Sequence, residues 1–295
     1  MNYKNVFITI YFFIYRVFIR KPIVLSSKET IKRIINERLS ISRFGDGEIS
    51  LMMKTGGPKF QSASDELSDD LWLSFNKRSK NLLICLSKID FRFPYKSIER
   101  DHYKRYLYYT FRKALRQKKI DFRYKYGNTD LTRFYHPALY KKTNFKKLER
   151  YVFELKKIWN SRKLVIVEGE ETKLGVGNDL FDNALSIKRI ICPSRNAYFC
   201  KDKIINAIKA NCSEDCLVLL SLGPTASIVS AYISTETNIQ IVDVGHVDVV
   251  YIWFLYRAKE NKGIEHKTVN ETNTDEQIKL NVDMTKYESE IIVRI

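Results

Sequence analysis

The chain has 295 residues, and its 51 lysines and arginines outnumber its 34 aspartates and glutamates, giving a net charge of +17. A composition of 44% hydrophobic and 13% aromatic residues excludes a disordered chain, and the length fits one large domain or two ordinary ones. Five cysteines without a short repeated spacing exclude a disulfide framework and a cysteine-rich zinc site, and they predict a reduced, cytoplasmic protein.

Residues 1–25 form an apolar and basic N-terminal segment. Val6 to Tyr15 is apolar or aromatic apart from Thr9, and Arg16, Arg20 and Lys21 follow. The run is shorter than the ~20 residues that span a membrane, and no signal-peptide cleavage site follows it. Two interpretations stay open: a helix lying on the membrane surface with its cations at the headgroups, and a first helix packed on the domain.

A helix predicted from Glu29 to Leu39 is followed by a pair of carboxylates, Asp46 and Glu48. The glycines beside them let a divalent cation approach closely, and Mg²⁺ or Mn²⁺ is usually held by one or two carboxylates together with substrate phosphates. Arg43 is expected to add a bidentate phosphate contact. The alternative is that Asp46 caps a helix beginning near Glu48 and Arg43 pairs with a surface acid.

Short apolar runs bounded by polar turns are typical of buried parallel strands. They lie at 82–86, 164–167, 190–192, 216–220 and 239–242, with helical stretches between them such as 201–210 and 225–233. This alternation predicts an α/β fold with a mostly parallel sheet.

Most of the excess charge lies between Arg100 and Lys163, where 20 lysines and arginines accompany 5 aspartates and glutamates. Aromatic residues are interleaved with these cations. Such a segment can contact nucleic acid, anionic lipid or an anionic substrate. The alternative is a pair of solvated helices whose aromatic side chains face the core.

Polar or glycine-containing turns follow four of the predicted strands, at 168–170, 193–194, 223–226 and 243–246. The carboxyl ends of parallel strands form the crevice in which ligands bind, so these turns are expected to face one site. Gly223 and Thr225 also open a predicted helix whose free amides suit a phosphate. Taken singly, each turn is also compatible with ordinary loop chemistry.

Six ordered blocks between about Ser26 and Glu271 together resemble the GT-D-type glycosyltransferases, a family formerly described as a domain of unknown function in bacterial surface-glycan and adhesin-glycosylation loci. The blocks are Arg43-Phe44-Gly45-Asp46-Gly47-Glu48, Val167-Glu168-Gly169-Glu170, Gly175-Val176-Gly177-Asn178-Asp179-Leu180-Phe181, Pro193-Ser194-Arg195-Asn196-Ala197, Leu222-Gly223-Pro224-Thr225-Ala226 and Asp243-Val244-Gly245-His246-Val247-Asp248. A late Lys267-Thr268-Val269-Asn270-Glu271 looks like the family's terminal Lys-Tyr-Val-Asn-Glu.

The resemblance implies a Rossmann-like, mostly parallel sheet with helices on both faces, and a metal-dependent transferase that uses a nucleotide sugar. It implies a metal, Mn²⁺ or Mg²⁺, at Asp46 and Glu48, and places His246 and Asp248 near the reacting sugar as catalytic residues. The expected donor-binding residues are Arg43, Gly45, Glu168, Gly169, Lys173, Gly175, Gly177, Asn178, Asn196, Gly223 and Thr225.

Two departures from the family pattern concern function. Val250 and Ile252 stand where the family tends to have acids after His-x-Asp, so Asp248 or His246 must supply the general base if one of those acids normally does so. Lys173 stands where arginine is expected, which replaces a planar bidentate group with a point charge.

The sequence therefore predicts a single glycosyltransferase-like domain over residues 26–275, with the basic aromatic segment 100–163 as a helical insertion and residues 276–295 as a C-terminal tail. The expected reaction moves a hexose from a UDP-sugar to an acceptor glycan, including a lipid-linked one, in bacterial surface polysaccharide or glycoprotein biosynthesis. The expected location is cytoplasmic, or peripheral on the inner face of the membrane. The alternatives are a nucleic-acid-binding protein, which this placement of the charge disfavours, and a degenerate transferase that binds its donor without turnover.

Overall fold

The computed structural model describes residues 22–87 and 120–295, so the N-terminal run from Val6 to Lys21 and the first part of the basic segment lie outside the described residues. The strands are β1 (Ile23–Val24), β2 (Ser40–Phe44), β3 (Leu82–Leu86), β4 (Lys125–Asn128), β5 (Lys163–Gly169), β6 (Ser186–Cys192), β7 (Cys216–Ser221), β8 (Gln240–Asp243), β9 (Gly263–Ile264), β10 (Gln277–Ile278) and β11 (Ile291–Arg294). The α-helices are α2 (Ser27–Asn36), α3 (Asp46–Met52), α4 (Asp65–Asn76), α7 (Phe145–Lys156), α8 (Lys201–Asn211), α9 (Pro224–Glu236), α10 (Val247–Leu255) and α11 (Met284–Glu290). The described residues also form three 3₁₀ helices, η1 (Thr129–Thr132), η2 (Pro137–Lys142) and η3 (Ala197–Cys200).

Nine of the strands form one sheet in the order β1-β4-β3-β2-β8-β7-β5-β6-β11, and every pairing in it is parallel. The predicted strands at 82–86, 164–167, 190–192, 216–220 and 239–242 are confirmed as β3, β5, β6, β7 and β8, because their apolar runs are buried on both faces. The predicted α/β class with a mostly parallel sheet is therefore confirmed.

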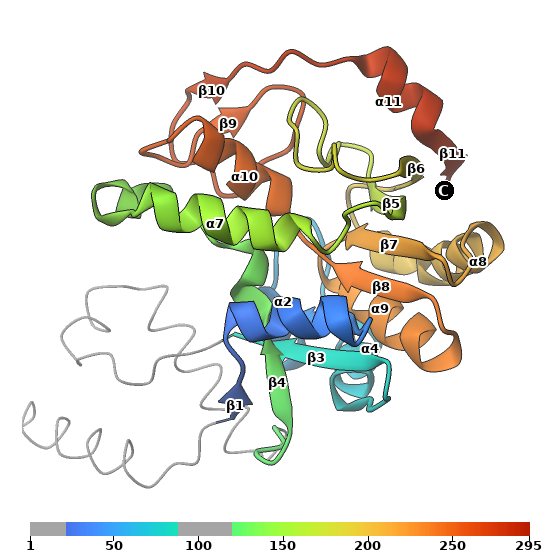
Figure 1. Cartoon of the computed structure of the whole chain (residues 1–295). Helices are drawn as coiled ribbons and strands as arrows, with labels where there is room; N and C mark the ends of the chain where they lie inside the picture. Colours follow the sequence, from blue (N-terminus) through green and yellow to red (C-terminus); the bar gives the residue numbers. More distant parts are fainter. Residues whose placement is uncertain (1–21, 88–119) are drawn as a thin grey trace, which may run out of the picture.

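Helices cover both faces of the sheet, as Figure 1 shows with α2 and α7 on one side and α8 and α9 on the other. Alternate residues of one strand face the two layers: Leu217 and Leu219 of β7 pack in the cluster that includes α7 and α10, while Val218 and Leu220 pack with α8 and α9. This period of two is what a strand buried on both faces requires.

β2 was not predicted as a strand, because Ser40, Ser42 and Arg43 interrupt its apolar pattern. Ser40 contacts β8, since its Oγ accepts from the N–H of Ile241 at 2.9 Å. The other two contact α9: Ser42 Oγ donates to the carbonyl of Ser227 at 2.7 Å, and Ser227 Oγ donates to the carbonyl of Arg43 at 2.6 Å. Small residues on α9 thus let the helix lie close to the strand and satisfy its polar groups.

Two predicted boundaries are corrected. The described part of the basic segment is not an insertion beside the fold, since β4 lies inside the sheet between β1 and β3, and α7 covers one face. Residues 276–295 are not a tail, because β11 adds the ninth strand by pairing with β6. β1, which falls within the predicted N-terminal segment, pairs with β4. In the described part of the chain, no helix has the length and apolar character needed to cross a membrane.

Candidate active site

A cleft lies at the carboxyl edge of the sheet. Since all strands are parallel, the segments that follow β5, β6, β7 and β8 meet at this edge, and they enclose a cleft of about 210 Å³. The cleft is lined by Lys59, Phe60, Gln61, Gly169, Glu171, Thr172, Pro193, Ser194, Arg195, Asn196, Ala197, Ser221, Leu222, Gly223, His246, Thr268 and Asn270. The predicted convergence of the strand-end turns on one site is therefore observed.

One wall of the cleft comes from residues 56–62, which the sequence did not single out. The backbone N–H of Asn196 donates to the carbonyl of Phe60 at 2.9 Å, and Asn196 Oδ1 accepts from the N–H of Ser62 at 2.7 Å. Asn196 adopts the left-handed conformation, with φ of 54°, which asparagine tolerates better than most residues. This side chain therefore fastens the loop to the turn after β6.

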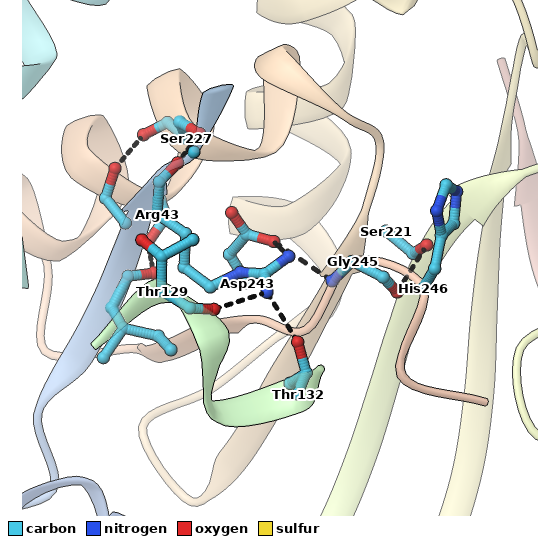
Figure 2. A network of polar contacts seen from close by, with 12 residues as sticks. Arg43, Thr129, Thr132, Ser221, Ser227, Asp243, Gly245 and His246 are labelled. Atoms are coloured by element: carbon cyan, nitrogen blue, oxygen red, sulfur yellow. Dashed lines mark hydrogen bonds and ion pairs between the residues drawn. The ribbon is translucent and has the colours of Figure 1, made fainter. Parts of the chain in front are cut away.

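Arg43 lies beneath the turn that carries His246, and its contacts are internal. Its guanidinium pairs with Asp243 at 3.2 Å and donates to Thr132 Oγ1 at 2.6 Å and to the carbonyl of Thr129 at 3.2 Å. Figure 2 shows this network, with Gly245 and His246 following Asp243. Arg43 pairs with a buried acid, so neither a surface ion pair nor a free phosphate-binding guanidinium is observed.

His246 is the predicted catalytic residue that lines the cleft. It is the N-cap residue of α10, and its Nδ1 lies 3.5 Å from Glu271 Oε1. Glu271 also lies 3.7 Å from Arg133 Nη2. Burial acts to raise the pKa of Glu271, but the contacts with His246 and Arg133 outweigh it and hold this pKa below its ordinary value. A partly exposed imidazole thus stands in the cleft with an ionised carboxylate behind it.

Asp248, the second predicted catalytic residue, is fully buried, does not line the cleft and forms an ion pair with Lys267 at 2.7 Å. The same carboxylate accepts from the N–H of Gly175 at 3.1 Å, and Lys267 Nζ also donates to the carbonyl of Lys173. Asp248 therefore holds the loop that follows β5, and this burial keeps it from contact with a ligand in the cleft.

Glu168, like Asp248, holds the loop that follows β5. It is fully buried, pairs with Arg189 at 2.7 Å and accepts from the N–H of Leu174. Arg189 in turn pairs with Glu290 of α11 at 2.7 Å and donates to the carbonyl of Leu174 at 3.0 Å. Burial raises the pKa of Glu168 although Arg189 opposes the rise. These buried charges fix the path of residues 172–178.

Asp46 and Glu48 begin α3, directly after β2, at the same edge of the sheet but outside the residues that line the cleft. Glu48 Oε2 accepts from the N–H of Gly45 at 2.9 Å, so Glu48 caps the helix, which begins at Asp46. Burial and the nearby charge of Asp243 raise the pKa of Glu48. No group of three or more His, Cys, Asp or Glu among residues 22–87 and 120–295 is arranged to hold a metal.

The predicted donor-binding residues divide into two groups. Those that line the cleft are Gly169, Asn196 and Gly223; those that do not are Arg43, Gly45, Glu168, Lys173, Gly175, Gly177, Asn178 and Thr225. Gly175 and Gly177 have φ of 76° and 79° and shape the loop after β5, against Phe181 and Leu280. The side chain of Lys173 donates to the carbonyl of His266 at 2.9 Å.

Sequence reasoning did not assign a role to several residues that line the cleft, namely Lys59, Phe60, Gln61, Arg195, Thr268 and Asn270. Arg195, Thr268 and Asn270 belong to blocks that carry the family resemblance, so the resemblance could have identified them as site residues. The first three follow Gly56-Gly57-Pro58, a turn signal that gives no indication of the long-range contact with Asn196.

Comparisons with known proteins identify similar sequences and structures. A family described as "Glycosyltransferase GT-D fold" matches residues 41–272. The chain is 34% identical over 278 residues to a probable glycosyl transferase Gly of Streptococcus gordonii, covering 94% of this chain and 39% of that protein. It is 36% identical over 276 residues to the glycosyltransferase GlyD of Streptococcus pneumoniae serotype 4 (strain ATCC BAA-334 / TIGR4), covering 90% of this chain and 32% of that protein. The chain thus spans about a third to two-fifths of the length of these relatives.

Solved structures match over nearly their whole length. A domain of unknown function 1792, described as having a distinct glycosyltransferase fold, is 33% identical, with a TM-score of 0.77 over 94% of this chain and 96% of that one. A new glycosyltransferase of the same domain type from Streptococcus sanguinis is 30% identical, with a TM-score of 0.77 over 93% of this chain and 100% of that one.

Proposed function

This chain belongs to the glycosyltransferase GT-D fold family, and from that premise we propose that it transfers a hexose from a nucleotide sugar, a UDP-sugar, to an acceptor glycan. The observation that carries the proposal is the position of His246, in the cleft at the carboxyl edge of the sheet with Glu271 behind it. The nucleotide sugar binds in this cleft, where Gly169 packs against Ser194 and Gly223 packs against Phe60.

His246 acts as the general base. Glu271 faces Nδ1, which leaves Nε2 to take the proton of the acceptor hydroxyl as that oxygen attacks the anomeric carbon of the sugar. The bond between this carbon and the diphosphate breaks, and the nucleoside diphosphate leaves with its electron pair. Glu271 holds the imidazole in orientation and stabilises its protonated form, the role a carboxylate has behind a catalytic histidine. Asp248 is assigned a positioning role.

A divalent metal, Mn²⁺ or Mg²⁺, fits the donor set of Asp46 and Glu48 in chemistry, since both are carboxylates on the first turn of one helix. Two protein ligands are what Mg²⁺ often has when substrate phosphates and waters complete its shell. Gly47 packs near Pro58, next to the loop that forms one wall of the cleft, and this supports a metal at the pair. When bound, the metal would neutralise charge on the departing diphosphate.

The burial of positions 250 and 252 in the core supports an active enzyme over a donor-binding scaffold. Val250 and Ile252 are buried in the hydrophobic cluster around α10, at 7% and 0% exposure, and neither lines the cleft. The departure from the family pattern therefore removes no carboxylate from the cleft, and His246 remains to act as the base.

The acceptor is a glycan of bacterial surface polysaccharide or glycoprotein biosynthesis, including a lipid-linked form, and the protein contacts the inner face of the membrane through its basic residues. The described basic residues that support this contact lie on one exposed stripe of α7 and its C-cap. Lys146, Arg150 and the C-cap residue Lys157 flank Phe153, which is 66% exposed. Such a mixed basic and apolar surface is attracted to anionic lipid.

The test is release of UDP from a panel of UDP-hexoses, with Mn²⁺ or with EDTA, for the wild type and Asp46→Ala. The proposal expects release that EDTA abolishes and that Asp46→Ala lowers by about 100-fold, the order of loss on removal of one electrostatic contact to the leaving group. Ser64→Ala, which removes the cap of α4, is a matched control for disturbing a helix start. Release that is indifferent to EDTA and to Asp46→Ala would remove the metal from the mechanism.

A further inference from the structure

The wall of the cleft carries two cations with no role in the chemistry above, Lys59 and Arg195. Both residues are exposed, and both line the cleft. Neither side chain forms an ion pair or hydrogen bond with another residue in the described part of the chain. Cations placed in a concave site without a protein partner are available to an anionic ligand.

The backbone brings these two cations together although 135 positions separate them in the sequence. Lys59 directly precedes Phe60 and Arg195 directly precedes Asn196, and the Phe60 carbonyl accepts the 2.9 Å hydrogen bond from the Asn196 N–H. Gly223 packs against the same wall, because a Cβ at position 223 would come within 2.5 Å of the Phe60 ring. The two cations therefore stand on adjoining segments, next to the start of α9.

The surroundings of the pair favour an anion. Glu171 is the one described carboxylate that lines the cleft, and its Oε2 accepts from Thr268 Oγ1 at 2.6 Å. α9 begins beside the wall with its positive dipole end, and no side chain caps it. Thr225, in its first turn, is fully buried and its hydroxyl has no hydrogen-bond partner among the described residues.

We propose that Lys59 and Arg195 are the residues that bind the diphosphate of the sugar donor. The guanidinium of Arg195 can bind two phosphate oxygens at once, and Lys59 adds a point charge. The nucleotide part of this assignment rests on the proposed function; the affinity for a diphosphate group does not. The pair adds protein cations to the diphosphate site independently of a metal at Asp46 and Glu48.

The experiment measures equilibrium binding of UDP, UMP, uridine and inorganic pyrophosphate to the whole chain in EDTA, for wild type, Lys59→Ala and Arg195→Ala. Each substitution is expected to weaken UDP and pyrophosphate binding about 10-fold to 100-fold, as expected for a hydrogen bond to a charged group, and to leave uridine binding unchanged. Lys59→Arg keeps the charge and retains most of the affinity. Arg123→Ala and Lys203→Ala, exposed cations that do not line the cleft, are the matched controls.

Each outcome bears on the two proposals separately. If Lys59→Ala and Arg195→Ala bind UDP and pyrophosphate as tightly as the wild type, or lose uridine affinity to the same extent, the pair is not the diphosphate site. If both substitutions weaken pyrophosphate binding but the wild type binds UDP no more tightly than pyrophosphate, Lys59 and Arg195 bind a diphosphate group and a UDP-sugar is not the donor. If the wild type binds no pyrophosphate, the pair is overturned whatever the donor.

Discussion

Gly245 lies directly against the guanidinium of Arg43: a Cβ at position 245 would come within 2.0 Å of Arg43 Nη2. The guanidinium cannot move aside freely, because it is held by Asp243, Thr129 and Thr132. Gly245 also has φ of 50° and donates its N–H to Asp243 Oδ1 at 3.2 Å. β2 and β8 thus fix the turn that presents His246 to the cleft.

Gly245→Ala is therefore expected to destabilise the fold by about 1–3 kcal/mol, the usual cost of a strained backbone position, and to lower kcat for UDP release more than it raises KM for the donor. Urea unfolding and steady-state kinetics measure both effects. In an Arg43→Ala background the same substitution should cost less, since the clash is removed and only the backbone strain remains. An equal cost in both backgrounds would show that Arg43 does not constrain the turn.

Glu271→Gln is expected to lower kcat by about 10-fold to 100-fold with little change in KM for the donor, as is common for the partner that orients a functional histidine. Glu271→Asp should restore part of the rate by keeping the charge. Glu265→Gln, a partly buried acid of the same C-terminal region, is the control. If Glu271→Gln raises KM for the donor by the same factor as it lowers kcat, Glu271 instead binds the donor.

The stability of the same variant is expected to depend on pH. Because the folded state lowers the pKa of Glu271 below its ordinary value of 4.5, the carboxylate stabilises the fold above that pH, and the stabilisation is lost as pH falls through the lowered pKa. The free-energy difference between wild type and Glu271→Gln, measured by urea unfolding from pH 6 to pH 3, should therefore shrink as the pH falls below 4.5. A difference that grows on acidification would contradict the assignment.

Arg189→Met is expected to destabilise the fold by about 3–5 kcal/mol, because it leaves Glu168 and Glu290 without their shared cation, and Glu168 is fully buried. Adding Glu168→Gln to this variant should recover part of the loss, since the buried charge is then removed. Lys209→Met breaks the exposed pair with Glu236 and should lower the free energy of unfolding far less than Arg189→Met does. If Arg189→Met and Lys209→Met lower the free energy of unfolding equally, the buried network contributes no more to stability than an exposed ion pair.

The basic stripe of α7 is expected to bind anionic membranes. Reversal of Lys146, Arg150 and Lys157 to Glu should lower sedimentation of the full-length protein with phosphatidylglycerol vesicles at low salt. Wild-type binding should itself weaken as salt screens the charges. The matched control reverses Lys188, Lys203 and Lys279, three exposed lysines of other elements. If both triple variants bind alike, net charge and not the α7 stripe governs the contact.

The sheet was predictable where burial on both faces produced continuous apolar runs, as in β5 and β7. β2 was not, because its serines and Arg43 find their partners on α9, η1 and β8, which are far away in sequence. The positions of the site residues were predictable for a similar physical reason. Parallel strands guarantee that strand-end turns meet, so Gly169, Gly223 and His246 were predicted to share one edge.

The role of a charged residue was harder to predict than its position. Asp248 and Glu168 follow strands in the pattern expected of ligand-binding acids, and nothing local distinguishes them from Asp46. Their partners, Lys267 and Arg189, are 19 and 21 positions away, and only the fold shows that these pairs are buried. Lys59 lies on a loop whose place in the cleft depends on a hydrogen bond to Asn196, which no local pattern reveals.

The most direct test of the catalytic account compares UDP release from UDP-hexoses by the wild type and by His246→Ala, together with the Kd of each protein for UDP. The account predicts that the wild type releases UDP from at least one donor and that His246→Ala slows release by about 10²-fold to 10⁴-fold, the contribution of a general base, while the Kd stays unchanged. An undiminished rate in His246→Ala, or no UDP release by the wild type from any UDP-hexose, would contradict it.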